Sequence, residues 1–367
     1  MEVTAAVATP STIGAPCSVS WPCWILEYMK IIVAPDSFKE CLDAGEVASA
    51  IAEGIFSVSP DAEVRLVPLS DGGEGMAGIL TESLGGELVP AKVTGPMGET
   101  VEARFGRVGN TAILDVASAC GLNLVPKERR NPLIATSRGV GELIVAAINS
   151  GCEELLIGLG GSATCDGGEG MMSVPGLRDI ASGVKIKVLC DVDNPFIGIR
   201  GAARVFGPQK GADPQMVEML EKRLELQAER ILSQTGVDVS MMPGAGAAGG
   251  LGGALHAYLG AELVPGIETV LDILGFDKEI VDADLIITGE GASDLQTLSG
   301  KVPMGVLRRS KGIPVCILSG RVKDRDDLLS AGFAAAVQVT PEGIPTSEAI
   351  KPVIAKANLR LAASRLL

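Results

Sequence analysis

Five glycine-rich loops hold the residues of this sequence that are best suited to chemistry. They lie at residues 71–75, 160–168, 207–211, 243–250 and 289–294, and four of the five also contain charged side chains. Glycine tolerates positive φ angles, so its N–H groups can approach an anion closely. Aspartate and glutamate in such loops can hold Mg²⁺ or accept a proton. Together the loops predict phosphate chemistry, although any one of them alone is also compatible with an ordinary turn.

Two familiar nucleotide signatures were compared with these loops. The Gly300-Lys301 pair lacks the preceding glycine and the following hydroxyl of a P-loop, which excludes a P-loop kinase by motif. Residues 244–249 match G-x-G-x-x-G and are followed about 20 residues later by Glu268, a spacing that suits a dinucleotide site. A strand should precede that motif, but residues 237–242 are short and broken by Asp238. An NAD-dependent dehydrogenase therefore remains a remote alternative.

Composition limits the class of protein. A chain of 367 residues predicts two domains or one large domain. The net charge of −14 has the wrong sign for a nucleic-acid-binding protein. Eight cysteines without C-x-x-C spacing favour a reduced, cytoplasmic protein, and the uncharged stretches 3–26 and 239–261 contain too much proline, glycine or alanine to span a membrane. The single His256 excludes Ser-His-Asp triads and histidine-based zinc sites that do not use it.

The order of predicted elements indicates an α/β protein. Residues 1–28 contain both tryptophans and are expected to be a non-native or disordered extension, so the main fold should begin near Met29. A strand at residues 30–35, a helix starting with Asp43 and Glu46 as a capping pair, and a strand at residues 64–69 form a β-α-β unit. This order predicts a parallel sheet that binds ligands at the carboxyl ends of its strands.

The same pattern returns near the C-terminus, with strands expected at residues 283–288, 314–318 and 334–339. We therefore expect a discontinuous Rossmann-like parallel-sheet domain formed by residues 29–84 and 263–367. A second α/β domain, residues 85–262, is expected to be inserted into it.

A series of short motifs runs in order along the chain from Met29. They comprise residues 29–40, 69–75, 94–98, 130–143, 190–195, 206–211 and 243–250. In these motifs the sequence resembles the bacterial type I glycerate kinase (glycerate 2-kinase) family. The resemblance implies ATP-dependent phosphorylation of D-glycerate to 2-phosphoglycerate by a two-domain α/β protein, with ATP and Mg²⁺ as cofactors. A 3-phosphoglycerate product and homodimer formation both stay open.

Roles for individual residues follow from this resemblance together with their chemistry. Glycerate and ATP are anions, so a negatively charged protein needs Mg²⁺ and local lysines to bind them, and phosphoryl transfer needs a carboxylate to orient or deprotonate the attacking hydroxyl. The expected catalytic residues are Asp191, Lys39 and Asp193, with Asp71 and Asp191 as metal ligands; a simple turn is the alternative for Asp193. Substrate binding is expected from Asp36, Ser37, Asp71, Gly72, Gly73, Glu74, Ser162 and Asp166. Nucleotide binding is expected from Gly207, Lys210, Gly246, Gly249, Gly289, Glu290 and Asp294.

The sequence departs from the family pattern at three places. Cys165 stands where the family usually has asparagine, and Ala292 stands where it has arginine. After Met172 only residues 173–184 precede the next expected strand, whereas the family has a longer segment there. An active enzyme, a catalytically impaired paralogue that binds glycerate or nucleotide, and an error in the gene sequence are the three alternatives that these departures leave open.

Overall fold

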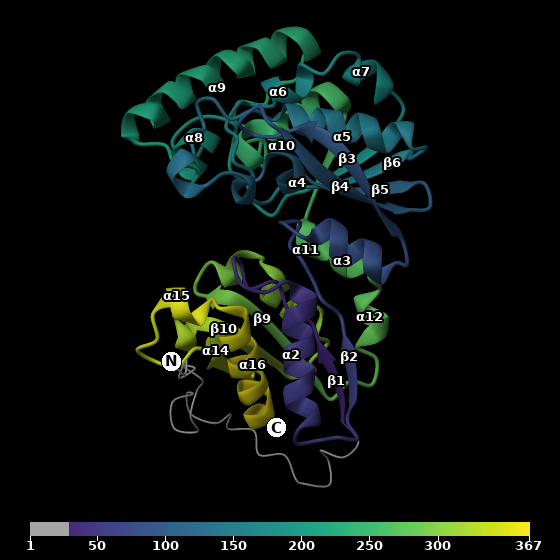
Figure 1. Cartoon of the computed structure of the whole chain (residues 1–367), viewed down its shortest axis with the longest axis vertical. Helices are drawn as coiled ribbons and strands as arrows, with labels where there is room; N and C mark the ends of the chain where they lie inside the picture. Colours follow the sequence, from purple (N-terminus) through teal and green to yellow (C-terminus); the bar gives the residue numbers. More distant parts are fainter. Residues whose placement is uncertain (1–28) are drawn as a thin grey trace. The chain divides into compact units, whose positions relative to one another are not determined.

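The computed structural model describes residues 29–367, so the extension expected at residues 1–28 lies outside the described residues. Within the described part, the chain divides into two units. The first unit comprises residues 29–71 and 270–367, and the second unit comprises residues 72–269. Each unit has its own sheet (Figure 1). Each also has its own hydrophobic core. This arrangement confirms the α/β class, with one unit inserted into the sequence of the other.

The first unit is built on a five-stranded sheet with the order β11-β10-β9-β1-β2, and every neighbouring pair is parallel. Its strands are β1 (Lys30–Val33), β2 (Glu63–Leu66), β9 (Leu285–Ser293), β10 (Val315–Val322) and β11 (Ala335–Gln338). β1 and β9, which are more than 250 residues apart in the sequence, pair at Ile31 and Leu285. Their side chains are fully buried, as expected for a parallel sheet covered on both faces.

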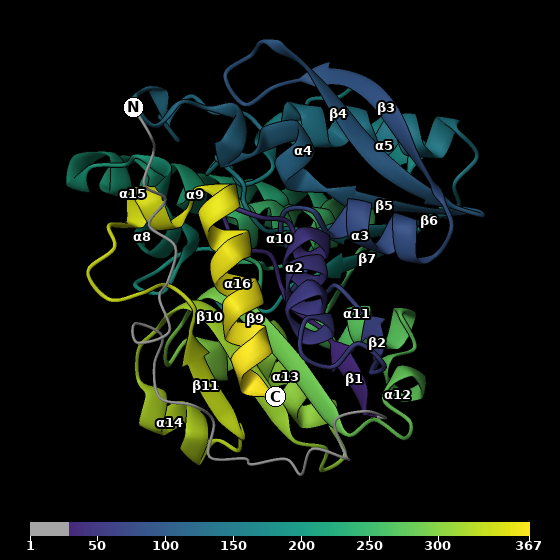
Figure 2. The ribbon, with the colours of Figure 1, turned by 60° about the horizontal axis from the view of Figure 1, so that its bottom comes forward.

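Two long helices of the first unit, α2 (Ala44–Phe56) and α16 (Pro352–Leu366), lie side by side (Figure 2). The expected capping pair starts α2: the Asp43 carboxylate accepts from the N–H of Glu46, and the Glu46 carboxylate accepts from the N–H of Asp43. A Cβ atom on Gly54 would lie 2.3 Å from the carbonyl oxygen of Arg360, so glycine permits the close approach of the two helices. The other helices of this unit are α12 (Phe276–Glu279), η4 (Thr297–Ser299), α13 (Val302–Arg309), α14 (Arg325–Ser330) and α15 (Thr346–Ala349), while α11 (Gly266–Ile273) crosses the unit boundary.

The second unit has a six-stranded mixed sheet with the order β3-β4-β5-β6-β7-β8. β3, β4 and β5 are antiparallel neighbours, whereas β5 to β8 are parallel. Its strands are β3 (Glu87–Thr94), β4 (Thr100–Val108), β5 (Thr111–Asp115), β6 (Glu154–Gly158), β7 (Lys185–Leu189) and β8 (Glu262–Val264). The parallel half therefore has carboxyl ends at a common edge, where loops can present functional groups.

Helices of very different length cover this second sheet. The longest is α9 (Pro214–Thr235), whose buried residues Leu220, Leu224 and Ile231 recur at helical spacing on one face. The others are α3 (Met76–Ser83), α4 (Val116–Cys120), η1 (Leu122–Leu124), η2 (Lys127–Arg129), α5 (Arg138–Asn149), α6 (Glu169–Met172), α7 (Leu177–Ile180), α8 (Ala202–Phe206), η3 (Pro208–Lys210) and α10 (Ala247–Leu259). No helix among residues 29–367 is long and apolar enough to cross a membrane.

The unit boundaries differ from those expected at residues 84/85 and 262/263. Residues 72–84 belong to the second unit because the N–H groups of Gly75 and Ala77 both donate to the Asp115 carboxylate, at 3.0 Å each. Residues 263–269 also belong to it, because β8 pairs with β7. From sequence alone, both segments are compatible with a β-α-β unit of the first domain. Only these tertiary hydrogen bonds show that they belong to the second unit.

The segment expected to be shortened, residues 173–184, forms a compact connection in the structure. It contains the single-turn helix α7 and leads directly from α6 into β7. β6 and β7 still pair in parallel register from Glu154 opposite Lys185 to Gly158 opposite Leu189. The short connection therefore leaves the pairing of β6 with β7 intact.

Candidate functional site

The first unit contains a cavity of about 380 Å³ at the carboxyl ends of β1, β9 and β10. The chain after β1 reaches it by running along β9, with the N–H of Asp36 donating to the carbonyl oxygen of Gly289 at 2.8 Å. The ionisable side chains that line it are Asp36, Asp71 and Glu290 together with Lys39, Lys301 and Arg321, and Glu40 also lies on its wall. The structure thus gathers Asp36, Ser37, Lys39, Asp71 and Glu290 of the predicted site residues around one space.

Asp36 is the most strongly perturbed carboxyl group of this cavity. Its side chain is only 6% exposed, and its Oδ1 accepts from the N–H of Ser37 at 2.7 Å. Burial, followed by the negative charge of Asp71, raises the pKa of Asp36 to about 8, although the Ser37 hydrogen bond and Lys39 act in the opposite direction. The Asp36 carboxyl group can therefore exchange a proton near neutral pH, or become fully ionised when a cation binds beside it.

Glu290 is fixed by a network of its own. Its Oε1 accepts from the hydroxyl groups of Ser293, at 3.0 Å, and Thr297, at 2.6 Å. Its Oε2 lies 3.4 Å from Nζ of Lys301. This network keeps a buried carboxylate paired and holds Lys301 at the cavity wall.

Lys301 and Arg321 were not among the residues predicted for the site. Lys301 belongs to the Gly300-Lys301 pair, which does not match a P-loop, and the sequence offered no other reason to place it in a site. Arg321 lies on β10 directly opposite Ala292 on β9, and both residues line the cavity. The sequence signal near Arg321 was the expected strand at residues 314–318, which leads into Ser319-Gly320, but strand order was needed to bring Arg321 to this wall.

Two other predicted nucleotide-binding residues have local structural roles. A Cβ atom on Gly289 would lie 2.1 Å from the carbonyl oxygen of Leu318, so glycine is required where β9 and β10 pack closely. Asp294 Oδ1 accepts from the N–H of Gln296 at 2.9 Å and so stabilises the turn before η4. Nucleotide binding by either residue remains a prediction.

In the second unit, residues 72–75 form a turn that leads into α3. Gly72 and Gly75 both adopt positive φ angles, and a Cβ atom on Gly160 would lie 2.5 Å from the Cα atom of Gly73. Glu74 is exposed and accepts from Nδ2 of Asn123 at 2.8 Å. The turn is thus packed closely against the loop at residues 160–168.

Asp115, which was not among the predicted site residues, holds this turn through hydrogen bonds. Its buried carboxylate accepts the two N–H groups at the start of α3, and burial raises its pKa to about 7 despite these hydrogen bonds. The signal that could have identified it is its position at the end of the apolar run 112–114, which forms β5.

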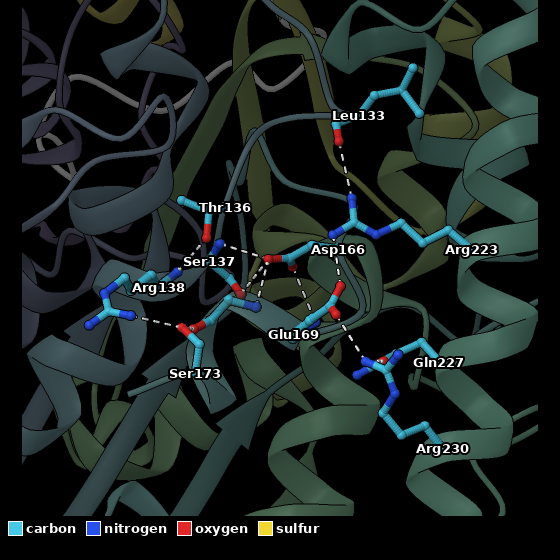
Figure 3. Close-up of polar contacts among 12 residues, drawn as sticks. Leu133, Thr136, Ser137, Arg138, Asp166, Glu169, Ser173, Arg223, Gln227 and Arg230 are labelled. Carbon is cyan, nitrogen blue, oxygen red and sulfur yellow. Dashed lines mark hydrogen bonds and ion pairs between the residues drawn. The ribbon is translucent and has the colours of Figure 1, made fainter. Parts of the chain in front are cut away.

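Asp166 lies at the centre of a dense hydrogen-bond network (Figure 3). It is 1% exposed, and its Oδ2 accepts from the N–H and the hydroxyl of Ser137, at 2.8 and 2.9 Å, and from the N–H of Gly170, at 3.1 Å. Its Oδ1 accepts from the N–H of Gly168 at 3.2 Å. Nearby, Glu169 pairs with Arg223 and Arg230 of α9. This geometry favours a role for Asp166 in holding the loop, with substrate binding left as a prediction.

Lys210 and Ser162, two further predicted site residues, contact each other in the interior of the second unit. Lys210 is 3% exposed, and its Nζ donates to the Ser162 hydroxyl at 2.9 Å and to the carbonyl oxygen of Thr164 at 2.6 Å. Burial lowers the pKa of Lys210, and burial also raises the pKa of neighbouring Cys165 to about 11. Gly207 N–H and Lys210 N–H make helix-type bonds within η3 and α8. Lys210 therefore ties the loop at residues 207–211 to that at residues 160–168.

Asp191 and Asp193, predicted to share catalysis and metal binding, have different surroundings. Asp191 Oδ1 and Oδ2 accept from the N–H groups of Gly266 and Ile267, at 2.7 and 3.2 Å, at the start of α11. Asp193 is exposed and pairs with Arg200 at 2.5 Å, which lowers its pKa. Asp191 is thus held in a fixed orientation, whereas Asp193 lies in a solvated ion pair.

Residues 243–250, the G-x-G-x-x-G match, lie in the packed interior of the second unit. Gly246 N–H donates to the carbonyl oxygen of Asn194 at 3.0 Å, and a Cβ atom on Gly249 would lie 2.0 Å from the carbonyl oxygen of Thr164. Residues 237–242 form no strand. The motif therefore lacks the strand that a dinucleotide-binding turn requires, and its glycines serve close backbone packing.

The acidic side chains of the first unit were also considered as a metal site. Among residues 29–367, no group of three or more histidine, cysteine, aspartate or glutamate residues could hold a metal ion. Mg²⁺ in phosphoryl-transfer sites commonly uses only one or two protein carboxylates together with substrate phosphates and water. Asp36 and Asp71, whose negative charges interact across the cavity, fit that smaller requirement.

Comparison with known proteins identifies relatives over nearly all of this chain. A model described as "Glycerate kinase family" matches residues 31–181 and 172–367. The two matched ranges overlap at residues 172–181, almost all of which lie within the segment, residues 173–184, that the sequence predicts to be shortened.

Individual relatives agree with this match. The chain is 43% identical to a glycerate kinase of Bacillus subtilis (strain 168), over 88% of this chain and 93% of the relative. It is 46% identical to a glycerate 2-kinase of Escherichia coli (strain K12), over 81% and 86% respectively. A crystal structure from Salmonella typhimurium LT2, of a protein assigned as glycerate kinase 2, aligns with a TM-score of 0.77 and 41% identity over 92% of this chain and 96% of that one.

Proposed function

Because this chain belongs to the glycerate kinase family, we propose that it transfers the γ-phosphoryl group of ATP to D-glycerate and forms 2-phosphoglycerate and ADP. The match over 88% of the chain at 43% identity carries this proposal. The cavity supports it, since it combines carboxyl groups that suit Mg²⁺ with lysine and arginine side chains that suit anionic reactants.

Phosphoryl transfer depends mainly on positioning and on neutralising charge. We propose that Ser37 and Lys39, beside the buried Asp36, bind the anionic groups of the reactants. Lys301, which Glu290 holds at the cavity wall, adds a second positive charge there. These residues bind and orient; they form no covalent intermediate.

Asp191 is the proposed general base. The 2-hydroxyl oxygen of glycerate forms a bond to the γ-phosphorus, the bond from that phosphorus to the β-phosphate oxygen breaks, and the hydroxyl proton passes to Asp191. The N–H groups of Gly266 and Ile267 hold this carboxylate in one orientation. Its predicted role as a metal ligand stays a proposal.

Mg²⁺ would neutralise negative charge on the phosphates when it is bound. Asp71 and Asp36 are the residues we propose to hold it. A bound cation would favour the ionised form of Asp36, which burial and Asp71 oppose in its absence.

One relative, from E. coli, is named glycerate 2-kinase, and this name favours 2-phosphoglycerate over the alternative product, 3-phosphoglycerate. The impaired-paralogue alternative has a structural counterargument, because the shortened segment leaves the pairing of β6 and β7 intact. The structure argues against the dehydrogenase alternative, because no strand precedes the glycine motif at residues 244–249. A homodimer and a cytoplasmic location remain predictions.

Phosphorus NMR of the reaction mixture tests the proposed regiochemistry. The full chain is incubated with D-glycerate, ATP and MgCl₂, and the phosphomonoester signal is compared with authentic 2- and 3-phosphoglycerate. The 2-phosphoglycerate signal is expected. A 3-phosphoglycerate signal would support the alternative product, and a mixture without any new phosphomonoester would contradict the proposed reaction.

A further inference from the structure

Arg321 on β10 lies beside the uncharged Ala292 on β9 at the wall of the cavity. In the parallel pairing of β9 with β10, Arg321 is opposite Ala292, and both residues line the cavity. The alanine methyl group cannot bind an anion. The neighbouring strand therefore brings a guanidinium to the part of the wall that Ala292 leaves without charge.

The backbone fixes this juxtaposition. A Cβ atom on Gly320 would lie 2.5 Å from the carbonyl oxygen of Gly291, so the two strands approach each other closely just before Ala292 and Arg321. Val322 and Ser293 continue the same register on the other side. Arg321 is thus held at this wall by strand pairing rather than by a variable loop.

The partners of Arg321 leave most of its donors available. Its Nη2 donates to the hydroxyl of Thr346 at 2.9 Å, which orients the guanidinium with a neutral group. Among residues 29–367, no ion pair involves Arg321, whereas Lys301 is already paired with Glu290. A guanidinium has five N–H donors in a planar fork that suits carboxylate or phosphate oxygens.

The carboxyl groups that line the cavity make a positively charged group necessary for binding an anion there. Asp36, Asp71 and Glu290 line the same space, and an incoming oxyanion meets their repulsion. We propose that Arg321 binds an oxyanion of the reactants, either the glycerate carboxylate or an ATP phosphate, and so supplies from β10 the guanidinium that position 292 lacks. This proposal rests on the proposed function, because it assigns a binding residue of that same site.

A transposition of the arginine tests the proposal. The set comprises the wild type, Arg321→Ala, Ala292→Arg with Arg321→Ala, and Lys323→Ala as a control at an exposed cation two residues further along the chain. Arg321→Ala should lower kcat/KM about 10- to 100-fold, the usual range for one charge-assisted hydrogen-bonded contact, while the melting temperature stays close to that of the wild type. The double variant should have a kcat/KM at least fivefold above that of Arg321→Ala, and Lys323→Ala should keep the wild-type value.

Separate KM values distinguish the two oxyanion sources. A higher KM for D-glycerate with an unchanged KM for ATP assigns Arg321 to the carboxylate, and the reverse assigns it to a phosphate. Loss of kcat alone assigns it to the phosphoryl group in transfer. Kinetics of Arg321→Ala within twofold of the wild type, or a double variant no better than Arg321→Ala, would overturn the proposal.

Calorimetric titration separates failure of this proposal from failure of the proposed function. If the wild type does not turn over, the proposed function fails, and binding of D-glycerate and of ATP with Mg²⁺ still tests Arg321. Binding that Arg321→Ala weakens at least tenfold, and that the double variant restores, supports the proposal. Equal binding by wild type and Arg321→Ala, or no binding to the wild type, overturns it.

Discussion

Asp36 and Asp71 line the same cavity of the first unit, and the negative charge of Asp71 adds to burial in raising the pKa of Asp36 to about 8. When two carboxylates repel each other in a buried site, either one of them takes up a proton or a cation binds beside them. This relationship links the stability of the protein to pH and its proposed activity to Mg²⁺.

The first prediction concerns pH and stability. Between the ordinary pKa of Asp36, 3.8, and its raised value of about 8, the folded state binds a proton that the unfolded state does not. The contribution of Asp36 to stability is therefore complete below about pH 4 and is lost as pH rises towards 8. Urea denaturation should show Asp36→Asn gaining stability relative to the wild type across this window.

Asp61→Asn, which removes an exposed carboxylate from the same unit, is the matched control for that experiment. A difference between Asp36→Asn and wild type that is constant from pH 4.5 to 8.5 would contradict the raised pKa.

The second prediction concerns the metal ion. Asp71→Asn should raise the Mg²⁺ concentration needed for half-maximal turnover about tenfold or more, because it removes one of two proposed carboxylate ligands. Thermal shift with added MgCl₂ provides a second measurement, in which the variant should gain less than the wild type. An unchanged Mg²⁺ requirement and an unchanged thermal shift would remove Asp71 from the metal site.

The third prediction concerns the base. Asp191→Asn should lower kcat by a factor of about 10² to 10⁴, because the amide cannot take the hydroxyl proton. Asp238→Asn is the matched control, since Asp238 also accepts a backbone N–H in the second unit. Normal kcat in a folded Asp191→Asn protein would mean that Asp191 only caps α11.

The fourth prediction distinguishes two roles for Asp166, namely holding the loop at residues 160–168 and binding the substrate. Asp166→Ala should destabilise the protein by about 3 kcal/mol or more in urea denaturation, because three buried donors and the half-buried N–H of Gly170 lose their acceptor. Asp179→Ala, at an exposed carboxylate of the same unit, should leave stability unchanged. A stable Asp166→Ala protein with weakened glycerate binding would instead assign Asp166 to the substrate.

The fifth prediction concerns the glycine motif. Gly249→Ala combines a φ angle of +71° with a Cβ atom 2.0 Å from the carbonyl oxygen of Thr164, so it should prevent stable folding. Gly260→Ala, at a φ angle of +68° with no atom within 4 Å of the new Cβ, should cost only about 1 to 2 kcal/mol. Equal stability of the two variants would contradict the close packing of this segment.

The sequence predicted the α/β class and singled out several residues that line the cavity, because those features are local. Asp36 to Lys39 follow a strand in the chain, and the β-α-β order alone places them at a carboxyl end. Arg321 and Asp115 were missed because their roles depend on which strand lies beside which, as in the pairing of Arg321 with Ala292. Likewise, the direction of a carboxylate is decided by distant donors: Asp166 contacts Ser137, 29 residues away.

One measurement tests the central claim directly: ADP release by the full chain, coupled to NADH oxidation, with D-glycerate, with L-glycerate and without substrate. We expect ADP release that depends on D-glycerate, saturates with its concentration and requires Mg²⁺. ADP release no greater with D-glycerate than without substrate would contradict this expectation, even for a folded protein that binds glycerate.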